Sequence, residues 1–169
     1  MRTVKTSLHL HLTIDQGFSL IEVLVALFVL SIGLLGLAML QVTGIKFNSD
    51  SYSRTQATLL AYDVIDKMRA NLGEAGTGAY TVADASAATA KINAYNLCAT
   101  ATCNCDTAAC SSTNLALYDL GTWYKTQERS LPQSASQKST ITKNGNEYTI
   151  TIQWVERDMN MSQSWVINL

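Results

Sequence analysis

The chain has 169 residues, of which 47% are hydrophobic and 15% are charged, and its formal net charge is −1. This balance gives no basic surface for nucleic acid and no electrostatic preference for acidic substrates. Without its first 40 residues the chain keeps about 130, which suits one small domain with a single hydrophobic core.

Residues 1–17 form a short basic leader, and an apolar run follows over residues 18–40. As a helix, this run would be roughly 34 Å long, enough to cross a bilayer. A cleavable secretory signal would need a small-residue cleavage site after the run, and the end of the run offers none. Because Arg2 and Lys5 precede the run, the positive-inside rule predicts a cytoplasmic N-terminus and export of residues 41–169.

An acidic residue, Glu22, lies near the start of this apolar run. A charge at the centre of a bilayer costs about 2.5–3.5 kcal/mol on insertion scales, and less near the interface. A plain single-pass anchor whose Glu22 reaches the interface is one interpretation. The other interpretation supplies a cation: cleavage after Gly17 would create an α-amino group on Phe18. Within one helix that group would lie about 6 Å from Glu22, and a packed neighbouring helix could also present it.

The segment GFSLIEVLVALFVLSIGLLGL, preceded by a short basic leader, resembles the N-terminus of type IV pilins and pseudopilins. The resemblance implies cleavage between Gly17 and Phe18 by a prepilin peptidase, and N-methylation of Phe18. It also implies that the apolar helix packs in a filament core, where Glu22 neutralises the amino terminus of a neighbouring subunit and sets its register. Major pilins often have a proline within this helix. This run has Gly33 and Gly36 and no proline, which leaves open whether the helix melts there on assembly.

Beyond the run, helical spacing of apolar residues continues over residues 41–72. The residues that carry this spacing are Val42, Ile45, Ala57, Leu60, Ala61, Val64, Met68 and Leu72. Lys67 and Arg69 would complement the helix dipole in the last turn, and Gly73 suits the position after it. We therefore predict one helix of about 50 residues, whose second half is the spine of a globular domain.

Residues 73–112 are rich in Ala, Thr, Ser and Gly and poor in large apolar residues, which predicts a long variable loop. A helix is predicted next, over residues 113–131, with serine or threonine as its cap. Its apolar face would consist of Leu117, Leu120, Trp123, Tyr124 and Leu131. Gly121 weakens this helix prediction, because glycine is unfavourable in a helix interior.

The C-terminal residues 139–169 predict an antiparallel sheet. The segments STITK and EYTITIQWVE flank an Asn144-Gly145 turn signal, and a third strand would follow a turn at residues 157–161. Alternation predicts two buried sets, Tyr148, Ile150, Ile152 and Trp154 in the second strand and Trp165, Ile167 and Leu169 in the third. A three-stranded sheet on a helical spine is an α+β arrangement, and it is also the fold that the pilin resemblance implies.

Four cysteines, Cys98, Cys103, Cys105 and Cys110, are spaced C-x4-C-x-C-x4-C. In an oxidising compartment their even number predicts two disulfides, each worth about 2–4 kcal/mol of stability. We favour 98–103 with 105–110, or 98–105 with 103–110, over pairings that close the tight 103–105 loop. Zinc is the rival occupant, but the spacing is unusual for zinc and both histidines lie in the leader. We expect no metal and no cofactor.

The part of the chain after residue 17 has no histidine, no glycine-rich phosphate loop and no nucleophile elbow, so we do not expect an enzyme. Asp119, Trp123, Pro132 and the segment YTITIQW further resemble the PilV-type minor pilins, also called pilus modification proteins. This resemblance implies a single-pass protein of the bacterial inner membrane, with a periplasmic C-terminal domain, which joins a type IV pilus or its tip. The implied partners are other major and minor pilins, the prepilin peptidase and an inner-membrane assembly platform.

Two alternative functions stay open. A type II secretion pseudopilin of the GspI-like group shares most of the same features. A tip module for adhesion or DNA uptake is the other alternative, although the sequence offers no residue that binds DNA or a receptor.

Overall fold

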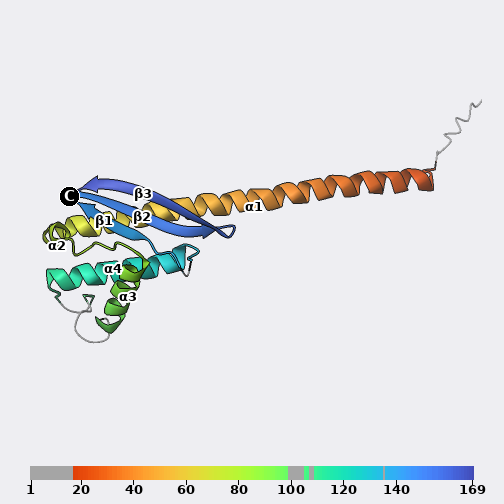
Figure 1. Ribbon diagram of the computed structural model, residues 1–169. Coiled ribbons are helices and arrows are strands. Elements are labelled where there is room, and N and C mark those ends of the chain that lie inside the picture. The colour runs from red at the N-terminus through yellow and green to blue at the C-terminus, as the bar shows by residue number, and fades with distance from the viewer. Residues whose placement is uncertain (1–16, 99–104, 107–108, 135) are drawn as a thin grey trace, which may run out of the picture. The chain divides into compact units, whose positions relative to one another are not determined.

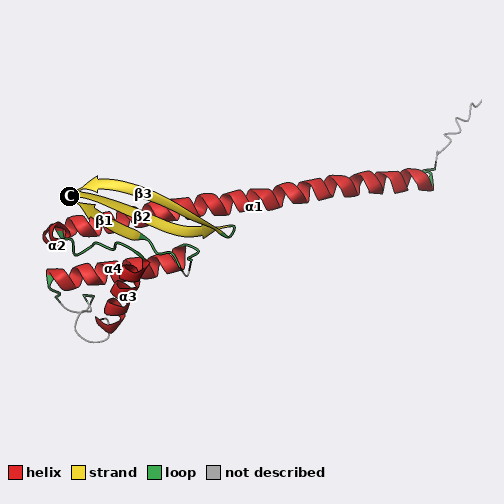
Figure 2. Ribbon diagram, viewed as in Figure 1, coloured by secondary structure: helices red, strands yellow, loops and turns green. Residues whose placement is uncertain are grey.

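The computed structural model of the protein describes residues 17–98, 105–106, 109–134 and 136–169. The chain divides into two compact units, one that ends at Ile45 and one that spans Lys46–Leu169. Helices α1 to α4 come first along the chain and strands β1 to β3 follow (Figure 1). Figure 2 distinguishes the helices from the strands. All three strands and the helices α2 to α4 belong to the second unit.

Helix α1, Leu20–Ala70, has 51 residues and confirms the predicted long N-terminal helix. Its first part is long and apolar enough to cross a membrane, because an 18-residue window has a mean hydropathy of 2.8 and none of it is buried. Ser31 and Thr43 donate their hydroxyl hydrogens to the carbonyls four residues earlier, at 2.7 and 2.9 Å. These two hydroxyl groups are therefore satisfied inside the helix, as a lipid environment requires.

The second half of α1 buries one face in the globular unit. The residues of this face recur three or four positions apart, which is the period of a helix. Ala57, Leu60, Ala61, Val64, Ile65 and Met68 are each at most 4% exposed. The predicted spine of the domain is confirmed, and tertiary packing of this stripe stabilises the helix more than intrinsic propensity does.

The prediction that the spine helix ends at Leu72, with Gly73 after its last turn, is wrong. Helix α1 ends at Ala70, and a short helix α2, Leu72–Thr77, contains Gly73. The left-handed glycine cap is at Gly78, where φ is 86° and the backbone N–H bonds to a carbonyl inside α2 at 3.0 Å. A glycine cap is thus present, but five residues later than predicted.

The prediction of a long loop over residues 73–112 is also wrong in part, because this segment contains α2 and a third helix, α3, Ala85–Cys98. The carboxylate of Asp84 accepts a hydrogen bond from the backbone N–H of Ala87 at 2.8 Å and so caps α3. Alanine has the highest intrinsic helix propensity, so this alanine-rich segment forms a helix although it has few large apolar side chains.

Helix α4, Ser112–Ser130, lies within one residue of the predicted helix at each end. The side chain of Ser111 accepts a hydrogen bond from the backbone N–H of Asn114 at 3.2 Å, which confirms the predicted serine cap. The indole Nε1 of Trp123 donates to the carbonyl of Leu60 at 2.8 Å. This buried bond joins α4 directly to the spine helix.

Helices α3 and α4 pack closely at Gly121. A Cβ atom added there would meet Cγ of Tyr95 at only 2.0 Å. The Tyr95 ring also lies edge-on to Tyr118, with 5.6 Å between centroids, and the ammonium of Lys125 lies 4.6 Å from its centroid. The glycine therefore makes a notch that receives the Tyr95 side chain of α3.

Strands β1, Thr140–Asn144, β2, Glu147–Glu156, and β3, Met159–Asn168, form an antiparallel sheet in the order β1-β2-β3. The predicted alternation in the second strand is confirmed, because Tyr148, Ile150, Ile152 and Trp154 are all buried. In β3 the predicted set is only half-buried, although Trp165, Ile167 and Leu169 do pack against the core. The α+β fold, a long helix on a small antiparallel sheet, is confirmed.

The turn between β1 and β2 is a two-residue loop of Gly145 and Asn146, one residue later than the Asn144-Gly145 signal suggested. Gly145 has φ 61°, whereas Asn146 does not have a positive φ. Glycine with a positive φ at the first loop position is typical of a type II′ hairpin turn, which matches the twist of the strands.

The turn between β2 and β3 consists of Arg157 and Asp158 alone, and is shorter than the predicted 157–161. Both residues have positive φ, at 51° and 63°, which is unfavourable for residues other than glycine. Arg157 forms an ion pair with Asp50, and its guanidinium lies 5.6 Å from the ring centroid of Phe47. These contacts with α1 stabilise the strained turn.

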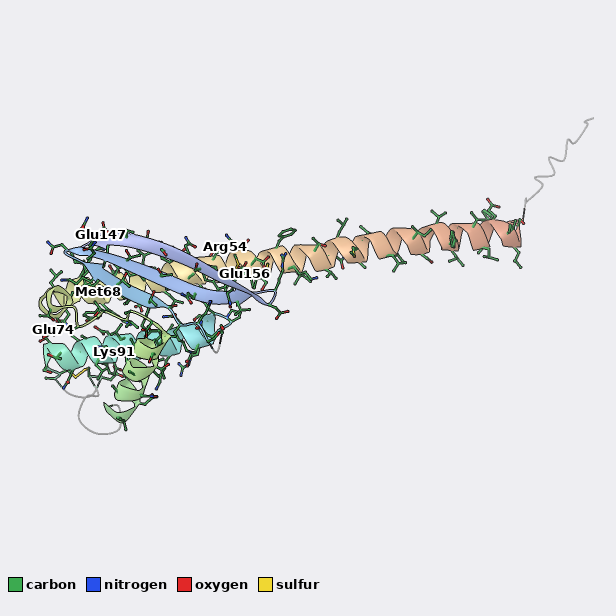
Figure 3. All side chains as sticks on the ribbon, viewed as in Figure 1. Arg54, Met68, Glu74, Lys91, Glu147 and Glu156 are labelled. Atoms are coloured by element: carbon green, nitrogen blue, oxygen red, sulfur yellow. A yellow bond between two sulfur atoms is a disulfide. The ribbon has the colours of Figure 1, made fainter. Side chains whose placement is uncertain are left out.

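Contacts at both ends of β2 fix its direction relative to the second half of α1. Near the start of β2, the hydroxyl of Tyr148 donates to the carbonyl of Ala75, which lies just beyond the end of α1. At its end, Glu156 lies 3.7 Å from Arg54 in an ion pair with the earlier part of that helix (Figure 3). Strand β2 therefore runs antiparallel to α1, and β3 runs parallel to it.

A buried polar network joins the end of α1 to α4. The hydroxyl of Tyr80 donates to the carboxylate of Asp119 at 2.6 Å, and the amide of Asn71 donates to that hydroxyl at 3.3 Å and to the carbonyl of Ser112 at 2.8 Å. Asp119 is 8% exposed, and burial raises the pKa of its carboxyl although the Tyr80 hydrogen bond opposes this shift.

Replacing Gly121 by alanine should destabilise the protein. The new methyl group would clash with Tyr95, and overpacking of this kind costs about 1–3 kcal/mol. Gly73→Ala is the matched control, because Gly73 is also helical and a Cβ there meets nothing within 4 Å. Urea unfolding of the full chain in detergent measures both. Equal stabilities of the two variants would contradict the packing account.

Asp119→Asn should change how stability depends on pH. The pKa of the Asp119 carboxyl is raised in the folded state. As the pH falls, this carboxyl therefore takes up its proton in the folded protein before it does so in the unfolded protein. The wild type should therefore gain stability relative to Asp119→Asn between pH 7 and pH 4, with the gain complete at the unfolded pKa of about 3.9. Unfolding of both proteins at the two pH values measures this difference. A difference that stays constant would contradict the raised pKa.

Candidate functional site

The predicted cleavage residues lie in exposed, non-helical backbone just before α1. Gly17 and Phe18 are both outside the helix, and a Cβ on Gly17 would meet nothing within 4 Å. The carbonyl of Ser19 accepts hydrogen bonds from the backbone N–H groups of Glu22 and Val23, at 3.0 and 3.3 Å, and so begins the helical ladder. The apolar helix thus starts two residues after Phe18, and the peptide bond between Gly17 and Phe18 is free of helical structure.

Glu22 is in the first turn of α1, where its negative charge is favourable beside the unpaired backbone N–H groups of the helix start. Ser19 and Glu22 also have the S-x-x-E spacing of a capping box, a local signal for the helix start that the analysis of the sequence missed. In the structure, the helix start is seen in the backbone hydrogen bonds to the Ser19 carbonyl.

Phe18 and Glu22 face the same open hollow. The hollow measures about 450 Å³, and its other lining residues are Val23, Ala26, Leu27 and Leu30. Phe18 is 84% exposed, so its ring has no packing partner in the described chain. The structure therefore brings the two predicted residues to one side of the helix start, with a carboxylate at the border of an uncovered apolar surface.

The apolar surface extends around the whole first part of α1. Every described residue from 17 to 45 is exposed, among them Leu24, Phe28, Leu35 and Leu40. Burying one such large side chain is worth about 1.5–3 kcal/mol, so leaving them all in water would be very unfavourable. This segment requires lipid or other apolar helices around it.

Gly33 and Gly36 lie within an uninterrupted stretch of α1. A Cβ at either position would meet nothing within 4 Å, so no contact among the described residues requires glycine there. Glycine lowers helix stability by about 1 kcal/mol relative to alanine, and it lets a neighbouring helix approach closely. Both properties fit a helix surface that contacts something outside the chain.

The structure contains the Cys105–Cys110 disulfide, which belongs to the first of the two predicted pairings. The alternative pairing of Cys105 with Cys98 is therefore wrong. Cys103 and the side chain of Cys98 lie outside the described residues. Directly after the disulfide, Ser111 caps α4, so the crosslink holds the chain at the start of that helix.

Asp106, between the two bonded cysteines, accepts a hydrogen bond from the hydroxyl of Tyr118 on α4. This bond raises the pKa of Tyr118 to about 12. No analysis of spacing could reveal this contact, because it joins a loop residue to a helix twelve positions away. Among the residues described here, no three His, Cys, Asp or Glu side chains gather in a way that could hold a metal ion.

Comparisons with known proteins found two family matches. Residues 13–38 match the family model described as the prokaryotic N-terminal methylation motif. Residues 39–121 match the family model described as type IV pilin Tt1218. The two matched ranges adjoin, and together they extend from the leader into α4. The searches of curated proteins and of solved structures found no match.

Proposed function

We propose that this chain, which the two family matches identify as a type IV pilin, acts as a minor pilin of the type IV pilus. Pilins are structural proteins, and the methylation motif and the exposed apolar helix fit a membrane-anchored one. In this proposal it resembles the PilV type and contributes to pilus initiation, assembly or the tip. Its partners are other pilins, the prepilin peptidase and the assembly platform.

The observation that carries the proposal is the placement of Phe18 and Glu22 on one open hollow at the start of an uncovered apolar helix. Cleavage between Gly17 and Phe18 frees an α-amino group, which N-methylation leaves cationic. In a filament that ammonium meets the Glu22 carboxylate of a neighbouring subunit. A carboxylate in apolar surroundings becomes tolerable once it is paired, so the pair fixes the axial register of the two helices.

The proposed topology follows from the same segment. Before assembly, residues 18–40 span the inner membrane, the leader 1–17 is cytoplasmic, and residues 41–169 are periplasmic. The Cys105–Cys110 disulfide supports an oxidising location for the globular unit. In the filament the apolar run exchanges lipid for like helices.

A type II secretion pseudopilin would use the same N-terminal chemistry. Filaments sheared from the cell surface separate the two functions, because a minor pilin is recovered in them and a pseudopilin is not. No contact in the described residues favours the third candidate, a tip module for adhesion or DNA uptake.

Glu22→Gln tests the proposed pairing. The variant keeps the shape of the side chain but leaves the neighbouring ammonium unpaired, which costs about 3–5 kcal/mol when the site is buried. We expect normal removal of the leader and about a tenfold or greater fall in the amount recovered in sheared filaments, because RT at 25 °C makes 1.4 kcal/mol a tenfold change. Quantitative immunoblots of membranes and filaments measure both quantities.

The matched control is Asp66→Asn, which removes an exposed acid from the second half of the same helix. It should be processed and incorporated like the wild type. Incorporation of Glu22→Gln at the level of Asp66→Asn would contradict the pairing. Absence of the wild-type chain from sheared filaments would instead count against a pilus role and for a secretion pseudopilin.

A further inference from the structure

Strand β3 is an edge strand without the features that normally protect one. It has ten residues, MNMSQSWVIN, none of which is charged and none of which is proline. Its pairing with β2 is continuous over ten residue pairs, so no bulge interrupts the edge. Edge strands of soluble proteins usually carry charge, proline or a bulge, because a regular unpaired edge is a template for another strand.

The opposite side of the sheet is covered. The backbone of β1 exchanges two hydrogen bonds between Ile141 and Val82, at 2.7 and 2.9 Å. Where β2 extends beyond β1, its Val155 N–H bonds to the carbonyl of Pro132 at 2.9 Å, and its Gln153 N–H bonds to Ser139 Oγ at 3.0 Å. In the described part of the chain, no backbone group pairs with the outer edge of β3. Within the described residues, the side of the sheet left open is therefore the edge of β3.

The core-facing side of β3 is also incompletely covered. Met161, Trp165 and Ile167 pack against the core but remain partly exposed, whereas the β2 residues that pair with them are buried. Leu169, directly after β3, is also only partly buried. An additional strand with apolar residues at alternate positions would extend the apolar layer beyond them. The outer edge of β3 therefore has both unpaired backbone groups, which can form hydrogen bonds with another strand, and partly exposed apolar side chains beside them.

The direction of the strands argues against a second copy of this chain as the occupant. Strand β3 runs parallel to α1, so antiparallel pairing of two β3 edges would place the Lys46 ends of the two α1 helices at opposite ends of the joined sheet. Subunits anchored in one membrane need those ends on the same side. Parallel pairing of two β3 edges would keep the ends together, but it would place the core-facing sides of the two β3 strands on opposite faces of the joined sheet, so their apolar borders would not meet. Pairing of β3 with β1 of a copy is prevented as well, because Val82 and Pro132 cover that side.

We propose that the outer edge of β3 receives an extended strand from a different membrane-anchored pilin subunit, which completes the sheet as a fourth strand. This inference rests on the proposed pilin function and names one of its partner surfaces. The incoming strand is uncharged where it lies along β3 and has apolar residues at alternate positions. Main-chain hydrogen bonds supply affinity, and the side chains facing Met161, Trp165 and Ile167 supply specificity.

A photo-crosslinking side chain, p-benzoylphenylalanine, tests the surface in the full chain. It is placed at Ser162, exposed on β3, or at Thr142, exposed on β1 at the other side of the sheet as the matched control. Membranes of the producing bacterium are irradiated, and crosslinked peptides are mapped by mass spectrometry. We expect at least a tenfold greater yield at Ser162 than at Thr142, with the adduct on an extended segment of a different pilin subunit.

Three outcomes would each overturn the inference. They are an adduct of the Ser162 probe with a second copy of this chain, equal crosslinking yields at Ser162 and Thr142, and no adduct at either position. The crosslinking assay uses membranes, so its result does not depend on whether the chain enters filaments. Recovery of the chain in sheared filaments tests the proposed function separately. Ser162→Lys should abolish the crosslink from a probe at Ser164, whereas Thr142→Lys should not. Equal crosslinking in these two variants would also overturn the inference.

Discussion

The structure depends on one constraint: the chain cannot bury the first part of its own longest helix. The globular unit closes its core without residues 17–45, all of which are exposed. A continuous apolar surface of this length has to be solvated by lipid or by other apolar helices. Membrane anchoring and helix-bundle assembly both satisfy this constraint, and a type IV pilin passes from the first to the second. In the proposed function, Glu22 makes that passage specific, since only a correctly placed cation makes its charge tolerable among apolar helices.

In the globular unit, the sheet and α4 are fixed to the second half of α1, but one edge of the sheet is uncovered in the described chain. Directional contacts join its parts to α1: the Trp123 indole bonds to the Leu60 carbonyl, and the strained turn at Arg157 pairs with Asp50. The sheet that these contacts orient is covered along β1, and no described residue covers the edge of β3. In our two proposals the exposed apolar helix and the exposed strand edge are alike, because each receives from another subunit an interaction that the described chain does not supply.

The sequence predicts those elements whose signals are local. The long helix and the alternating second strand follow from apolar periodicity. The leader and the roles assigned to Gly17, Phe18 and Glu22 also rest on local signals, and they stay predictions. The failures depend on contacts between distant residues. Helix α3 buries a short face made of Ala88, Ile92 and Tyr95. Its Tyr95 docks into a notch at Gly121, twenty-six positions later, and no local pattern reveals that contact. Gly121 weakens the prediction of α4, because glycine has a low helix propensity. Its presence in that helix is explained only by the packing of Tyr95 against it.

The central claim is that the counter-ion of Glu22 is created by cleavage after Gly17. The mass of the intact protein recovered from membranes and from sheared filaments tests this claim most directly. The account predicts a chain that begins at Phe18 and carries one additional methyl group on its amino terminus. A filament-incorporated chain that still begins at Met1 would contradict the account, because the ammonium on Phe18 would never have formed.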